Sequence, residues 1–136
     1  MSIVKAFDIA FNKMKTRKWD WIYVVVDIHD TIIKGDYNNE TFDYYPYAKE
    51  VLQILSKRED IVLILWSSSH SKQLKEYHSN FIKDNIDFNF INENPIELSN
   101  YLQDFSKKFY FNVGIDDKFG FDPENDWEIL YNYLIK

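Results

Sequence analysis

The sequence predicts one α/β domain, a three-layer Rossmann-like fold in which helices cover a mostly parallel central sheet. Two continuous apolar runs, 22–26 and 61–66, are typical of strands buried on both faces of a parallel sheet. Helical patterns lie between the apolar runs, as in βαβ units. The length of 136 residues fits a single domain with one core, so we expect 1–136 to form one unit.

Residues 1–20 contain a predicted amphipathic helix over 3–18. Val4, Phe7, Phe11 and Met14 fall on one face of it, at steps of three and four. Such a face can lie on a membrane surface, on a partner or on the core of its own domain. A stripe at helical spacing usually faces a core, so we expect this helix to pack on the sheet.

The remaining elements follow the same alternation. Weaker strands are expected at 88–91 and 109–115, and helices at 46–57, 71–84, 96–105 and 124–135. Pro46 suits the first turn of its helix. The side chains expected to point inward from three of these helices are Val51, Ile54 and Leu55, then Leu74, Tyr77 and Phe81, and finally Trp127, Leu130 and Leu134.

Composition and charge exclude several classes of protein. The chain has no Cys, which excludes a disulfide scaffold, a thiol nucleophile and a Cys-ligated zinc site. Sixteen basic and 22 acidic residues give a net charge of −6. Residues 1–18 carry five basic side chains and one acidic one, so the remainder has a net charge of −10, which disfavours a broad nucleic-acid surface. No apolar run approaches membrane-span length and no signal-peptide pattern is present, so we expect a soluble, cytoplasmic protein.

Polar side chains follow each predicted strand. Asp27 comes after the first strand, Ser67 after the second and Asp116 after the last, while Lys108 lies in the segment leading to that last strand. Ligands of open α/β sheets bind at the carboxyl ends of the strands. Asp27 and Asp116 would share Mg²⁺ there, because this cation prefers oxygen ligands. Ser67 would hydrogen-bond a phosphoryl oxygen and Lys108 would neutralise charge, which points to phosphoryl transfer with an aspartate nucleophile.

These residues resemble the haloacid dehalogenase superfamily of aspartate-nucleophile phosphohydrolases. The first motif, Asp-x-Asp-x-Thr after a buried strand, is matched by residues 27–31, and the second by Ser67. The third motif, a Lys, is best matched by Lys108, and the fourth by the acidic pair that ends 113–117. The resemblance covers about residues 22–122. Within the superfamily, the chain is similar to a subgroup of small, capless bacterial and phage hydrolases.

The resemblance implies a strand order of 5-4-1-2-3 with the first motif central. It implies that Asp27 is the nucleophile, and that Mg²⁺ is held by Asp27, the backbone carbonyl of His29 and Asp116. Asp117 would ligate directly, through water or structurally. Ser67 and Lys108 would hold the phosphate. Both intervals where the superfamily inserts a cap are filled by ordinary elements, so an open site is expected that admits a large phosphorylated substrate.

One position departs from the family pattern. The second Asp of the first motif, which protonates the leaving group and later activates water, is His29 here. Its loss removes a contribution of about 10²–10⁴-fold unless another group replaces it. Three consequences are open. His29 can take over the proton transfer, or its presence can convert the domain into a slow hydrolase, a phosphotransferase or a phosphate sensor. In the third case the domain is not catalytic and only binds its phosphorylated ligand. Asp30 stands where the family favours Gly. Because it is displaced by one residue from the position of the second Asp, its side chain would point in another direction and would not replace that Asp.

The sequence therefore leads to a Mg²⁺-dependent phosphohydrolase acting on a phosphomonoester. The alternative is a catalytically impaired domain that binds a phosphorylated ligand, nucleotide or protein partner. A third interpretation, a phosphatase that acts on nucleic-acid ends, fits an open site but not the acidic body.

Overall fold

The computed structural model describes residues 2–34, 42–69, 71–93 and 111–136. In chain order the elements are α1 (Ser2–Thr16), β1 (Ile22–Val26), α2 (Ala48–Lys57), β2 (Ile61–Leu65), α3 (Ser71–Lys83), β3 (Phe90–Ile91), β4 (Val113–Ile115), the 3-10 helix η1 (Asp117–Phe119) and α4 (Asp126–Leu134). The helix expected at 96–105 lies outside the described residues. From β1 to β3 strands and helices alternate, as the sequence pattern predicts.

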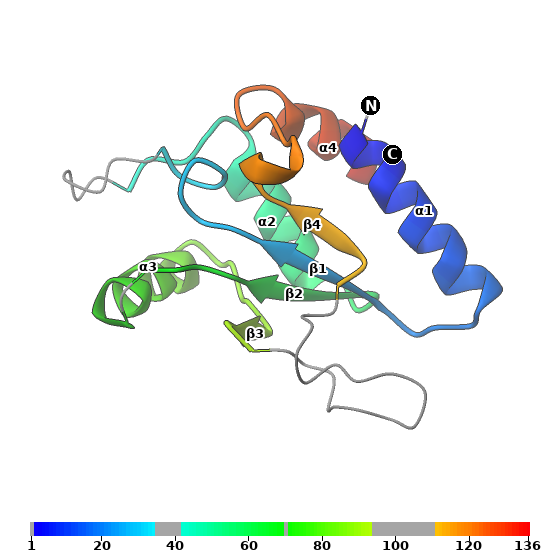
Figure 1. The fold of residues 1–136 in the computed structure, drawn as a ribbon, viewed down its shortest axis with the longest axis horizontal. Helices are drawn as coiled ribbons and strands as arrows, with labels where there is room; N and C mark the ends of the chain where they lie inside the picture. Colours follow the sequence, from blue (N-terminus) through cyan, green and yellow to red (C-terminus); the bar gives the residue numbers. More distant parts are fainter. Residues whose placement is uncertain (1, 35–41, 70, 94–110) are drawn as a thin grey trace.

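The sheet is parallel throughout, with the order β3-β2-β1-β4 (Figure 1). Ile22 pairs with Ile61 across β1 and β2, and Val24 pairs with Val113 across β1 and β4. This order equals the 4-1-2-3 part of the expected arrangement. With its flanking helices the sheet makes a three-layer Rossmann-like α/β fold, and β1 lies between β2 and β4. The carboxyl ends of these three strands therefore meet at one edge.

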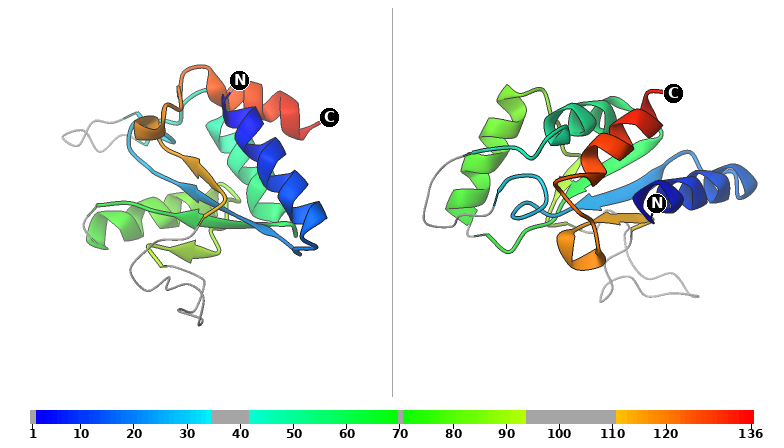
Figure 2. Two further views of the ribbon diagram at one scale, coloured as in Figure 1. Left: turned by 45° about the vertical axis from the view of Figure 1, so that its right-hand side comes forward. Right: turned by 90° about the horizontal axis from the view of Figure 1, so that it is seen from above.

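Three helices pack together against this sheet. α4 contacts both α1 and α2, while α1 also contacts β1 and β4, and α2 contacts β2 (Figures 1 and 2). α3 lies apart from this group, toward the β2–β3 side of the sheet (Figure 1). Among the described residues, no helix combines the length and the hydrophobicity that crossing a membrane requires.

The helix faces expected from the sequence are largely the ones that pack on the core. Phe7 is fully buried, and Val4, Phe11 and Met14 pack partly buried against the same cluster. Trp127 is also fully buried.

Two details of α2 differ from the expectation. Leu52 is fully buried where Ile54 was expected, because α2 contacts both β2 and α4 and its buried face is turned toward both. The helix also begins at Ala48, after Tyr47 in the left-handed conformation (φ 67°), so Pro46 precedes the first turn instead of forming it.

Candidate functional site

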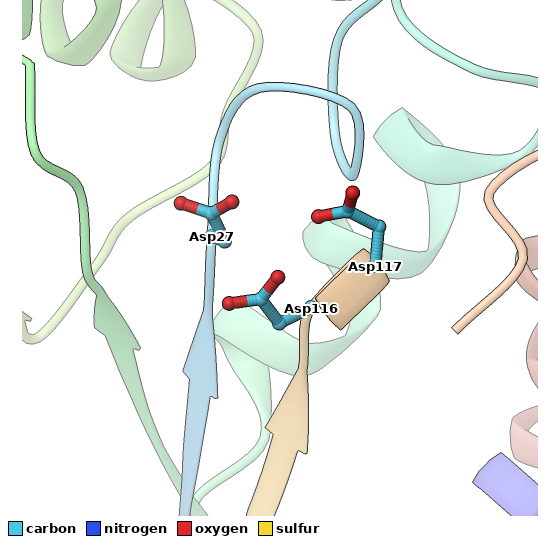
Figure 3. A group of neighbouring side chains, drawn as sticks. All are labelled: Asp27, Asp116 and Asp117. Carbon is cyan, nitrogen blue, oxygen red and sulfur yellow. The ribbon is translucent and has the colours of Figure 1, made fainter. Parts of the chain in front are cut away.

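Three carboxylates meet at the carboxyl edge of the sheet. Asp27 directly follows β1, and its backbone N–H donates to the carbonyl of Ile115 at the end of β4 (3.0 Å). This bond sets Asp27 beside Asp116 and Asp117, which follow β4. One carboxylate oxygen from each of the three lies within 4.8 Å of the others. Figure 3 shows the three carboxylates grouped beyond the ends of β1 and β4.

The proximity of these groups changes their acidity. Burial, and then the charge of Asp116, raises the pKa of Asp27 from 3.8 to about 6. Burial also raises the pKa of Asp116, and neighbouring Asp117 adds to that rise. Carboxylates this close repel one another when ionised, so the cluster favours either a shared proton or a cation.

A pocket of about 230 Å³ opens over the cluster. We call it the carboxyl-edge pocket, and it is lined by Asp27, His29, Asp30, Trp66, Ser67, Ser68, Asp116, Asp117 and Lys118. Five residues expected at the site from the sequence thus line one pocket: Asp27, His29, Ser67, Asp116 and Asp117. The sixth, Lys108, lies outside the described residues.

Lys118 is a site residue that the sequence argument missed. It lies in η1, lines the carboxyl-edge pocket, and its charge lowers the pKa of Asp27. Its backbone N–H donates to Asp116 Oδ1 (2.9 Å), which fixes that carboxylate relative to the turn. The sequence feature that could have indicated this role is the position of Lys118 directly after the acidic pair Asp116 and Asp117. Among the described lining residues it supplies the one ammonium group.

Ser67 is positioned by two different contacts. Its backbone N–H donates to the Asn92 side-chain oxygen (2.7 Å), and Asn92 Nδ2 donates back to the Ser67 carbonyl (2.9 Å). Its hydroxyl accepts from the Ser69 N–H (3.1 Å) and donates to the Ser69 hydroxyl (2.9 Å). The paired amide bonds tie the end of β2 to the end of β3. Asn92 therefore orders the backbone of Ser67.

Thr31 connects the first loop to the acidic turn. Its fully buried side chain accepts from the Asp117 N–H (3.2 Å) and donates to Asp117 Oδ1 (3.4 Å). The Thr31 carbonyl accepts from Trp127 Nε1 of α4 (2.7 Å). These bonds explain why a hydroxyl residue suits this position, since it holds the β1 loop and the β4 turn together at the pocket.

His29 contacts helix α3. Its Nε2 lies 2.8 Å from the Tyr77 hydroxyl of α3, and the two rings pack edge to face. Only 8% of the residue is exposed, and burial lowers its pKa, opposed by the charge of Asp30. Asp30 itself has φ 58°, the left-handed conformation that Gly adopts most readily.

The donor set fits a hard divalent cation. Carboxylate oxygens are the ligands that Mg²⁺ prefers, and one cation between Asp27, Asp116 and Asp117 would relieve their repulsion. Asp117 is exposed while Asp27 and Asp116 are half-buried, so the cluster is open on one side to water or substrate.

Comparison with known proteins gives one informative match. No family model and no curated protein matches the sequence. The solved structure of a conserved protein from Bacteroides thetaiotaomicron is 30% identical in sequence and superposes with a TM-score of 0.65. The match covers 85% of this chain and 90% of the Bacteroides chain. Its description states no activity or ligand.

Proposed function

We propose that this chain, which belongs to the same family as the conserved Bacteroides thetaiotaomicron protein, is a Mg²⁺-dependent phosphohydrolase of the haloacid dehalogenase type. Its substrate would be a phosphomonoester. The observation that carries the proposal is the convergence of Asp27, Asp116 and Asp117 in one pocket with Ser67 and Lys118. This set would combine a nucleophile, a cation site and two phosphate-binding groups, and it comes from three separate segments of the chain, at 27, 67 and 116–118.

The cation would be held by the three carboxylates, and the sequence resemblance adds the His29 backbone carbonyl. When bound, Mg²⁺ would neutralise charge on the carboxylates and on the phosphoryl oxygens. The protein contributes the alignment. Asp27 is fixed by its backbone bond to β4, Asp116 by the Lys118 N–H, and Asp117 by Thr31.

The chemistry then proceeds in two halves. An Asp27 oxygen attacks phosphorus, the bond to the leaving-group oxygen breaks, and an aspartyl-phosphate forms. The Ser67 hydroxyl and the Lys118 ammonium bind the phosphoryl oxygens as charge moves. His29 donates a proton to the leaving oxygen and later takes one from the water that cleaves the aspartyl-phosphate, which restores Asp27 and releases phosphate.

A second candidate function is a domain that binds a phosphorylated ligand without turning it over. The contact between His29 and Tyr77 favours it, because His29 Nε2 is already engaged at 2.8 Å. The lowered pKa of His29 also leaves less imidazolium to protonate a leaving group. The His29→Asp variant separates the two candidates. Hydrolysis that appears only in His29→Asp identifies the wild type as a binding domain.

A phosphatase assay with p-nitrophenyl phosphate and Mg²⁺ tests the proposal. We expect wild type to hydrolyse the ester, Asp27→Asn to be inactive and chelation of Mg²⁺ to abolish turnover. Asp20→Asn is the matched control, since Asp20 precedes β1 at the opposite end of the same strand. Turnover in Asp27→Asn equal to wild type would refute the nucleophile assignment.

A further inference from the structure

The carboxyl-edge pocket has an aromatic wall that the proposed reaction does not use. Trp66 lines the pocket beside Ser67, and 44% of its surface is exposed. Among the described lining residues it is the one large apolar side chain, and the others are charged, hydroxyl-bearing or imidazole groups. An exposed indole at the side of a polar pocket offers a flat apolar face on which a planar ring of a ligand can stack.

The backbone places Trp66 close to the nucleophile. The Trp66 N–H donates to the carbonyl of Val26 (2.9 Å), the residue directly before Asp27. β1 and β2 pair along their whole length, and Val26 and Leu65 are the last pair of residues. Asp27 and Trp66 are the residues that directly follow this pair. Trp66 and Asp27 are therefore neighbours across the ends of β1 and β2, and both line the carboxyl-edge pocket.

The carboxyl-edge pocket is too small to enclose both a phosphoryl group and a large leaving group. Its volume of about 230 Å³ is smaller than the roughly 300–1,000 Å³ of pockets that enclose a whole drug-sized ligand. The phosphoryl group and a cation would occupy the polar interior, and the leaving group would stay at the mouth. The acidic side chains of Asp30, Asp116 and Asp117 disfavour further phosphates there.

We infer that the leaving group of the substrate carries a planar aromatic ring that stacks on Trp66, as in a nucleoside monophosphate or an aryl phosphate. This inference rests on the proposed phosphohydrolase function of the pocket. Stacking of a base on an aromatic side chain tolerates any base, because each one presents a π-face. Trp66 thus contributes affinity for the ring, while Ser67 and Lys118 bind the phosphoryl group.

Calorimetric binding to the Asp27→Asn variant, at a Mg²⁺ concentration that saturates the remaining carboxylates Asp116 and Asp117, tests the inference without requiring turnover. AMP and ribose 5-phosphate differ only in the base, and phenyl phosphate and ethyl phosphate form the aryl pair. We expect the aromatic member of at least one pair to bind about 5- to 100-fold more tightly. Trp66→Ala should remove that advantage and Trp66→Phe should keep most of it. Trp21→Ala is the matched control, since Trp21 is also 44% exposed but precedes β1.

Each outcome decides between the claims. An advantage for AMP that depends on Trp66 identifies a nucleoside, and one for phenyl phosphate alone identifies an aryl group. Equal affinities within both pairs, or an advantage that survives Trp66→Ala, would overturn the inference and leave the proposed hydrolysis intact. A Trp66-dependent advantage in a protein whose wild type hydrolyses none of the four esters would instead refute the phosphohydrolase function and keep the aromatic site.

Discussion

Replacing Asp27 by Asn should stabilise the metal-free protein at neutral and alkaline pH. The pKa of Asp27 rises from 3.8 to about 6 on folding, because burial and Asp116 disfavour its charge. A raised acid pKa means that the native state binds the proton more tightly. The stability linked to this group is therefore fully present below about pH 3.8, and it is lost as the pH rises through about 6.

The size of the effect follows from this shift. The pKa rise of Asp27 from 3.8 to about 6, at about 1.36 kcal/mol per pH unit, corresponds to roughly 3 kcal/mol at pH 8. Because Asp27 is only half-buried, solvent screening reduces this free-energy difference to about 1–2 kcal/mol. For a domain of this size the gain corresponds to roughly 4–8 °C in melting temperature. The difference should shrink to about a third at pH 4.5, where the native carboxyl is mostly protonated.

Thermal unfolding in a chelating buffer, followed by circular dichroism, measures the effect. Asp27→Asn should melt above wild type at pH 8 and close to it at pH 4.5, whereas Asp20→Asn should follow wild type at both. Adding millimolar Mg²⁺ should raise the melting temperature of wild type and shift Asp27→Asn much less, since the variant has lost one carboxylate. An Asp27→Asn protein that melts at or below wild type at pH 8 without metal would refute the electrostatic argument.

Three further substitutions probe the supports of the site. Thr31→Val leaves the Asp117 N–H without its acceptor and should cost about 1–2 kcal/mol in urea unfolding, while Thr31→Ser should be nearly neutral. Gly114→Ala would bring its Cβ to 2.7 Å from the Phe119 ring, so it should displace η1, cost about 1 kcal/mol and weaken the stabilisation by Mg²⁺. His29→Asn should lower turnover about 10²-fold or more and flatten the pH profile below neutrality, which steady-state rates across pH will check.

The central strands and the acidic cluster were predictable from the sequence because burial and topology determine them. The run 22–26 carries only apolar and aromatic side chains, as a strand covered on both faces requires, and it forms the middle of the sheet. Parallel strands bring their carboxyl ends to one edge whatever the loops between them do. Asp27 and Asp116 therefore converge although 88 residues separate them in the chain.

The details that the sequence did not predict depend on how the chain turns between elements. Whether Leu52 or Ile54 of α2 meets the core depends on the rotation of the helix over the sheet, which helical spacing alone leaves open. Lys118 reaches the pocket because η1 turns immediately after Asp116, and a turn of three residues has no periodicity to detect. The contact between His29 and Tyr77 joins positions 48 residues apart and depends on where α3 lies.

That last contact involves the position at which the sequence differs from the haloacid dehalogenase motif that it resembles. An Asp at position 29 would be acceptor-only when ionised and would add a fourth carboxylate to a cluster that already raises the pKa of Asp27. A neutral imidazole adds no such repulsion, and the Tyr77 hydroxyl offers it a partner away from the three carboxylates. The exchange to His29 therefore lowers the electrostatic cost of the metal-free site.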